Sequence, residues 1–170
     1  MLELTSSRAV IVSCLDEPGA LDAMPDAAGA FKARIAPDEL WLVGPAGSAA
    51  AVMAHALKHL ERPGSYGVVT DVTDAWSVLT VTGSDVLTVW SRFSENALPA
   101  ARPAFVQGAV AFVAAKAIVF DSLIHFFTPA PQGHHLPHRI LHGCADLSPR
   151  ETDAREFVLR PRPTPTAGAR

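Results

Sequence analysis

Two stretches of this chain align with each other without a gap, and they constrain the fold more than any other feature. Leu40–Ala46 reads Leu-Trp-Leu-Val-Gly-Pro-Ala, and Ile124–Ala130 reads Ile-His-Phe-Phe-Thr-Pro-Ala. Each is a short apolar segment typical of a buried strand, and each is closed by a proline. The helical patterns behind them keep the same register: Val52, Ala56, Leu57 and Leu60 in the first copy, Leu136, Ile140, Leu141 and Cys144 in the second. The sequence therefore contains a repeated strand–turn–helix unit.

The other apolar patterns predict further strands and one more helix. Strands are expected at Arg8–Cys14, Gly67–Thr73, Ala75–Val81, Ala109–Ala115, Ala117–Phe120 and Phe157–Leu159, and helices at about Ser48–Leu60, Gly83–Phe93 and His135–Ala145. Asp16–Asp38 is rich in Ala, Gly, Pro and Asp, which favours a loop with one short helix at most. Two repeated units around antiparallel hairpins predict an α+β fold, a two-layer sandwich of a mostly antiparallel sheet with helices on one side.

The length of 170 residues fits one domain. We expect that domain to occupy residues 1–159. Residues 160–170 are rich in proline and arginine, a composition that predicts an extended or disordered tail.

Charge and hydropathy narrow the class of protein. The formal net charge of −3 argues against a nucleic-acid partner, which needs a basic surface. No apolar run reaches the roughly 18–20 residues that span a bilayer, and the N-terminus lacks the pattern of a signal peptide. Cys14 and Cys144 are far apart in the sequence, so we interpret them as reduced core residues. We therefore expect a cytoplasmic protein without a membrane partner.

A cluster of histidines is the clearest chemical feature. His135, His138 and His142 share one face of the last predicted helix and are the candidate ligands for a transition metal. The apolar residues occupy the opposite face, so the histidines also fit the polar face of an ordinary amphipathic helix. We favour a solvent-exposed or subunit-facing role and no metal; contact with a neighbouring cofactor or substrate channel is the third alternative.

Three aspartates could in principle do acid–base chemistry. Asp71 and Asp74 are three positions apart, an odd spacing, so a regular strand would send them to opposite faces. Asp85 at the start of a helix is explained by capping and by the helix dipole. We therefore prefer structural roles for all three and assign no catalytic residue.

No other motif predicts a site. The chain lacks a G-x-S-x-G elbow, and Gly44–Ser48 lacks the lysine of a phosphate-binding loop, which favours a turn followed by a helix cap. Trp41, Trp76 and Trp90 lie in apolar patterns, so we interpret them as anchors of the core or of an interface.

The stretch from Val68 to Leu87 carries a resemblance to a known family. It contains Val69-Thr70-Asp71-Val72-Thr73-Asp74-Ala75-Trp76, followed by Gly83-Ser84-Asp85-Val86, and Ala104–Gly108 reads Ala-Phe-Val-Gln-Gly. These segments resemble the V-x-D-V-S/T-x-x-W strand, the G-x-D-A/V helix start and the a-F-x-x-G motif of the sarcosine oxidase gamma-subunit family. That family shares the aminomethyltransferase fold with the N-terminal part of the glycine-cleavage T-protein. The resemblance covers about Leu40 to Asp146.

The resemblance implies a partner complex. Members of this size act in four-subunit, flavin-dependent amine oxidases together with larger alpha and beta chains and a small delta chain. FAD, FMN, NAD and tetrahydrofolate sit on the alpha and beta chains there, and a zinc ion sits on the smallest. A full T-protein needs about twice this length to enclose folate, so the resemblance transfers no catalytic residue and no cofactor to this chain.

Two hypotheses follow from different classes of protein. The first is a non-catalytic, gamma-like accessory subunit of a heterotetrameric sarcosine oxidase or a related N-methyl amine oxidase. It predicts an exposed apolar surface for partner chains. The second is a free-standing, small folate- or metal-binding protein of one-carbon metabolism, which predicts a pocket with converging polar groups. An unrelated interaction module is the remaining alternative.

Overall fold

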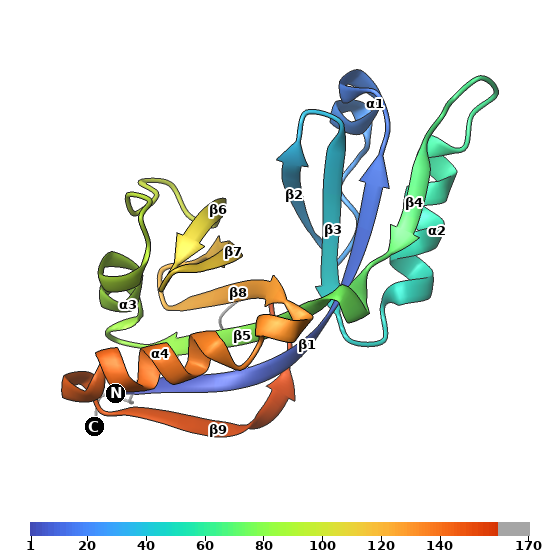
Figure 1. Cartoon of the computed structure of the whole chain (residues 1–170). Coiled ribbons are helices and arrows are strands. Elements are labelled where there is room, and N and C mark those ends of the chain that lie inside the picture. The colour runs from blue at the N-terminus through green and yellow to red at the C-terminus, as the bar shows by residue number, and fades with distance from the viewer. Residues whose placement is uncertain (160–170) are drawn as a thin grey trace, which may run out of the picture.

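The computed structural model describes residues 1–159, so the proline- and arginine-rich tail predicted at residues 160–170 lies outside the described residues. The strands are β1 (Leu2–Leu15), β2 (Phe31–Ala36), β3 (Glu39–Pro45), β4 (Val68–Asp71), β5 (Trp76–Gly83), β6 (Ala104–Val110), β7 (Val113–Val119), β8 (Leu123–Pro129) and β9 (Pro149–Glu156). The helices are α1 (Pro18–Ala23), α2 (Ala49–Leu60), α3 (Val86–Phe93) and α4 (His135–Gly143). Figure 1 shows their arrangement as two halves joined by β1. None of these helices is long and apolar enough to cross a membrane.

Strand β1 is the element that both halves share. Its N-terminal part pairs with β5 and β9, and its C-terminal part pairs with β3 and β4. The strand is longer than the expected Arg8–Cys14, because Leu2 and Leu4 continue the period-two pattern and are buried. Gly83, opposite Leu2, has a φ of 132°, and a side chain there would collide with the carbonyl oxygen of Met1. The close approach of these two strand ends therefore requires glycine.

In the first half, helices α1 and α2 cover one face of the strands. Val12 and Cys14 of β1 pack there against Leu21 of α1 and against Val52 and Ala56 of α2. All five side chains are buried. This arrangement explains the helical pattern of α2, whose apolar face is the one that contacts the sheet.

In the second half, β6, β7 and β8 form a meander, and the sheet continues from β8 through β5 and β1 to β9. Helices α3 and α4 cover one face of it. Trp90 of α3 stacks on Phe126 of β8, with ring centroids 6.3 Å apart, and Leu136 and Ile140 of α4 pack in the same core. Each half is thus a sheet with helices on one side.

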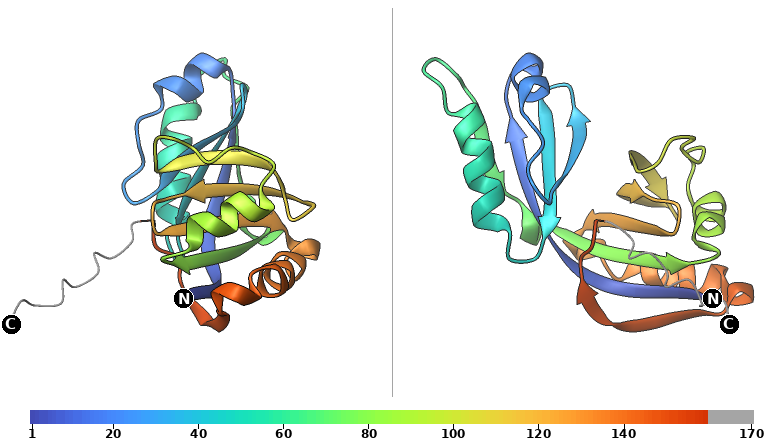
Figure 2. Two further views of the ribbon diagram at one scale, coloured as in Figure 1. Left: turned by 90° about the vertical axis from the view of Figure 1, so that its left-hand side faces the viewer. Right: turned by 180° about the vertical axis from the view of Figure 1, so that it is seen from behind.

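The helix-free faces of the two halves pack against each other. Ile11 and Trp41 from the first half meet Ile118, Phe127 and Phe157 from the second in one buried cluster. The views in Figure 2 show the sheet curving so that these faces turn toward each other. The α+β class, the mostly antiparallel sheet and the placement of helices on one side of it are confirmed; the sheet curls nearly into a barrel.

The repeated unit is also present in the structure. β3 and β8 each have seven residues, each ends at a proline, and each leads through a turn to a helix that covers its own sheet. After these helices, β4 and β9 both return to pair with β1. The copies differ in how they meet β1: β3 pairs with it directly, whereas β5 lies between β1 and β8. In addition, β4 runs antiparallel to β1 and β9 runs parallel to it.

Several expected elements are placed differently. The loop expected at Asp16–Asp38 contains β2, which pairs with β3 and has only Ala33 fully buried, so it lacks the alternation that marks a strand. β4 and β5 both pair with β1 instead of with each other. The last strand is β9, ahead of the expected Phe157–Leu159; its largely exposed, charged residues gave no apolar signal.

We predict that the two halves unfold together, because β1 cannot leave one half without breaking its pairing in the other. Trp41 reports on the first half and Trp90 on the second. The Trp76→Phe/Trp90→Phe variant keeps only Trp41, and the Trp41→Phe/Trp76→Phe variant keeps only Trp90. In urea, the midpoint from tryptophan fluorescence should equal the midpoint from circular dichroism in each variant. A fluorescence transition that precedes the circular-dichroism transition in either variant would show two separate domains.

Candidate functional site

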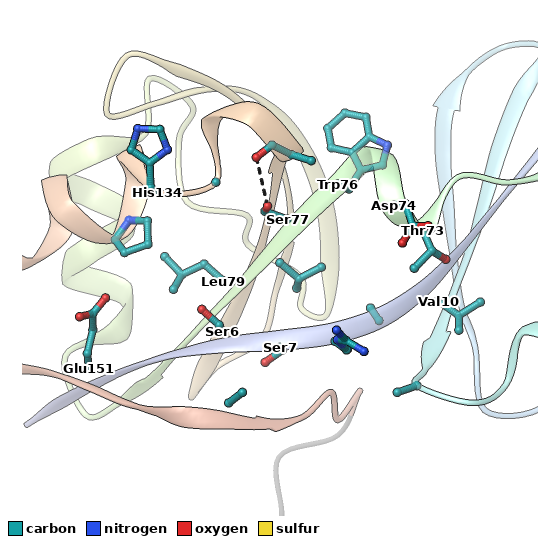
Figure 3. A pocket seen from close by; sticks show the side chains of 18 of the residues that line it. Ser6, Ser7, Val10, Thr73, Asp74, Trp76, Ser77, Leu79, His134 and Glu151 are labelled. Carbon is teal, nitrogen blue, oxygen red and sulfur yellow. Dashed lines mark hydrogen bonds between the residues drawn. The ribbon is translucent and has the colours of Figure 1, made fainter.

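A groove of about 1130 Å³ lies between α4 and the turn that precedes α2, over β1 and β5. The two equivalent turns of the repeat flank it, Ala46–Gly47 before α2 and the segment from Ala130 to Gly133 before α4. β1 and β5 contribute residues along its floor, as Figure 3 shows for Ser6, Ser7 and Leu79. The fold thus places the equivalent turns of both repeat copies beside the same groove.

The polar groups of the groove are dispersed along it and carry charges of both signs. His134 and Glu151 lie at one end and Asp74 lies near Trp76 at the other (Figure 3). Arg8 is exposed, and no hydrogen bond or ion pair of its side chain occurs within residues 1–159. Such a surface can hold the charged groups of a ligand, but in the described part of the chain no serine of the groove is hydrogen-bonded to a histidine.

The structure divides these histidines into two pairs whose rings are close together and tilted. The rings of His134 and His135 are 4.0 Å apart between centroids, and those of His138 and His142 are 4.2 Å apart. The Nδ1 atom of His142 is 2.8 Å from the carbonyl oxygen of His138, to which it donates. Leu136 is buried on the opposite face of α4. Of the candidate ligands, His138 and His142 are therefore brought together, whereas His135 pairs with His134. Among residues 1–159 no three His, Cys, Asp or Glu side chains are grouped to hold a metal ion.

The aspartates of the resembling stretch lie apart and make local contacts. Asp71 accepts a hydrogen bond from the backbone N–H of Thr73 at 2.9 Å, and Asp74 is exposed in the short turn before β5. Asp85 stands at the N-cap position of α3, yet it makes no capping bond. Its carboxylate instead accepts from the Ser84 hydroxyl, which lowers the pKa of Asp85, with the N-terminal ammonium adding to the effect.

The turn at Gly44–Ser48 has a structural role. Ser48 occupies the N-cap position of α2 without capping it; its hydroxyl donates to the carbonyl oxygen of Pro45 at 2.8 Å. A Cβ atom at position 44 would lie 2.5 Å from that hydroxyl, so this position of the Ser48 side chain requires glycine at position 44. Cys14 and Cys144 are both buried and unpaired, and burial raises the pKa of the Cys14 thiol to about 11.

The three tryptophans occupy different environments. Trp90 and Trp41 are buried in the cores, whereas Trp76 is half-buried at the edge of the groove. The rings of Trp41 and Trp76 meet edge to face at 4.7 Å, and the ammonium of Lys116 lies 5.1 Å and 4.6 Å from their respective centroids. This cation–π contact joins β3, β5 and β7, and so ties the two halves together beside the groove.

A buried histidine outside the expected cluster is the most constrained titratable group. His125 of β8 is fully buried, and its Nε2 atom lies 2.9 Å from the carbonyl oxygen of Val158, so Nε2 must carry the proton. Nδ1 therefore accepts from Thr80, whose hydroxyl oxygen in turn accepts from Ser7 at 2.8 Å. The ring also packs on Phe157 at 4.3 Å. This chain of bonds fixes the segment after β9 against the sheet.

Sequence reasoning missed His125 because it lies inside an apolar strand, where a lone histidine has no partner nearby in the sequence. Its partners Thr80 and Val158 come from β5 and from beyond β9. Burial lowers the pKa of His125 to about 4, and the hydrogen bond to Val158 opposes that shift only weakly.

We predict that Lys116→Gln destabilises the protein by about 1–2 kcal/mol, because it removes the cation from two partly desolvated indole rings. Lys116→Arg should retain most of the stability, since guanidinium also stacks on aromatic faces. Lys58→Gln on the exposed side of α2 is the matched control. Urea unfolding measures all three, and equal midpoints for Lys116→Gln and Lys58→Gln would contradict the assignment.

The stability of the protein should fall as the pH is lowered from about 6.5 to about 4. In this window the unfolded chain binds a proton at His125 and the folded chain does not, because the folded pKa of His125 is about 4. The loss should reach about 3 kcal/mol at the low end of the window. His125→Asn should be less stable at pH 7 and should show a shallower pH dependence than the wild type. An equal slope in both proteins would refute this assignment.

Comparisons with known proteins agree with this architecture. No family model and no curated protein matches the sequence. Among solved structures, a chain of the heterotetrameric sarcosine oxidase from Corynebacterium sp. U-96 superposes with a TM-score of 0.70 and 16% identity, over 89% of this chain and 87% of that one. The aminomethyltransferase T of the glycine cleavage system from Bartonella henselae superposes with a TM-score of 0.62 and 15% identity, over 88% of this chain.

The chain spans about half of the aminomethyltransferase, 47% of its length. At these identities the comparisons establish the fold and leave activity open. The resemblance seen in the stretch from Val68 to Leu87 is therefore confirmed at the level of structure: this chain has the aminomethyltransferase-like fold that is also found in a heterotetrameric sarcosine oxidase.

Proposed function

We propose that the protein is a non-catalytic, gamma-like accessory subunit of a heterotetrameric, flavin-dependent sarcosine oxidase or a related N-methyl amine oxidase or dehydrogenase. The proposal rests on how much of each chain superposes. The superposition on a chain of a heterotetrameric sarcosine oxidase covers 89% of this chain and 87% of the other. A chain that corresponds to a whole polypeptide of a multi-chain enzyme is best explained as a component of a similar assembly.

The comparison with the aminomethyltransferase supports the same proposal. This chain corresponds to 47% of that protein, about half of its length. In this proposal, larger alpha and beta flavoprotein chains hold FAD, FMN, NAD and tetrahydrofolate. A small delta chain completes the complex, which is cytoplasmic. The role of the present chain is structural, in assembly.

The groove favours a second candidate function. It is large enough for a small molecule, and it exposes Arg8, His134 and Glu151 together with the half-buried ring of Trp76. A free-standing, small folate- or metal-binding protein of one-carbon metabolism would use these groups to bind its ligand within this chain alone. We rank this candidate second because the polar groups are spread along the groove instead of converging on one point.

Purification of the tagged full-length chain from its source organism distinguishes the two functions. The accessory-subunit proposal expects larger chains in a fixed ratio and a flavin absorption spectrum, whereas the same chain expressed alone should be colourless. A colourless, monodisperse protein from the source organism would contradict the proposal. Titration of that protein with tetrahydrofolate and with Zn²⁺ would then test the second candidate, with Arg8→Ala as the variant expected to weaken an anionic ligand.

A further inference from the structure

The hairpin between β6 and β7 turns through two residues in an unfavourable conformation. Ala111 has a φ of 50° and Phe112 a φ of 64°, both in the left-handed region. Two-residue hairpins that need positive φ at both positions are usually made by Asn-Gly or Gly-Gly, because glycine adopts this conformation without strain. A bulky side chain such as phenylalanine is a rare occupant of the left-handed region.

Within the described residues, no packing of the Phe112 ring compensates for this backbone strain. Phe112 is 89% exposed, in contrast to Phe126 and Phe127 of β8, which are fully buried. Within residues 1–159 its ring packs against no other aromatic ring. The position therefore carries two independent costs, backbone strain and an exposed apolar ring, and neither is offset by a contact inside the described fold.

The base of the hairpin holds the tip in place. The backbone N–H of Ala111 donates to the carbonyl oxygen of Phe93 at 2.9 Å, and Ser94 pairs with Val110 in an isolated bridge. Val110 and Ala111 are buried against the second core. Phe112 thus projects from a fixed backbone, and a pre-ordered backbone loses little entropy when a partner binds.

The surroundings of Phe112 point to the chemistry of the partner. From Ala104 to Ala115 the hairpin contains no charged residue, although charged residues make up 18% of the whole chain. β9 contrasts with it: that strand is unpaired on its outer side and carries charged side chains at Arg150, Glu151, Asp153, Arg155 and Glu156. Charges of this kind keep other proteins away from an exposed strand. The β6–β7 hairpin lacks that protection.

We propose that the tip of the β6–β7 hairpin is a docking site, at which Phe112 inserts into an uncharged, apolar pocket of a larger partner protein. The proposal rests on the function proposed above, since it takes the partner to be a flavin-carrying chain of the complex. A second copy of this chain is a poor occupant, because its groove offers Arg8, Asp74 and Glu151 to an incoming phenyl ring. Buried aromatic anchors of this type dominate the energetics of protein interfaces.

Two glycine substitutions separate docking from a structural role. Phe112→Gly removes both the ring and the strain, and Ala111→Gly removes strain at the neighbouring position while keeping the ring. Phe112→Gly should raise the Tm of the isolated chain by about 2–4 °C. Ala111→Gly should raise it less, because it also removes a methyl group that is buried against the second core. Only Phe112→Gly should weaken binding to the larger chains that co-purify with the tagged wild-type protein, by about tenfold or more in Kd. Ala111→Gly should bind as the wild type does.

The other possible results of these experiments show whether the docking site, the accessory-subunit function or both are contradicted. If the wild-type chain binds the flavin-carrying chains and Phe112→Gly binds them equally well, the docking site is refuted and the accessory-subunit function stands. If the wild-type chain recovers no such partner, both proposals fail. A lower Tm for Phe112→Gly would show that the ring supports the fold. Sedimentation of the isolated chain as a dimer that Phe112→Gly dissociates would make a second copy the occupant and overturn the proposal.

Discussion

The pairing of β1 with four other strands is the interaction on which the rest of the structure depends. Its N-terminal part completes the second half between β5 and β9, and its C-terminal part completes the first half between β3 and β4. Because one continuous strand belongs to both halves, their relative position is set by backbone hydrogen bonds as well as by side-chain packing. The groove lies beside this strand, so its shape follows from the same constraint.

The contact between the helix-free faces completes the molecule. Trp41, Trp76 and Lys116 close it beside the groove, and within the second half His125 binds the segment after β9. The two contacts use different physics. The first contact places the Lys116 ammonium over aromatic rings at a half-buried position. The second uses the neutral, fully buried imidazole of His125, with both ring nitrogens hydrogen-bonded. The second is therefore the one that acid disrupts.

In the described part of the chain, the residues that could serve catalysis are not gathered at one point. The histidines of α4 are paired and exposed, the aspartates serve turns and helix starts, and the groove spreads its charges. Phe112 differs from these residues, since it combines a strained backbone with an exposed ring, and the docking proposal accounts for both. Proteins retain such costs where function requires them.

The sequence by itself determined the repeated strand–turn–helix unit, the α+β class and the amphipathic character of α2 and α4, because these depend on apolar periodicity within short segments. It also supported the aminomethyltransferase-like fold through the stretch from Val68 to Leu87. Only the tertiary structure decided the partners of β1, the strand β9 and the environment of His125, since pairing and burial join residues far apart in the chain. The strain at Phe112 was likewise invisible, because a backbone dihedral angle depends on the hairpin register that β6 and β7 adopt together.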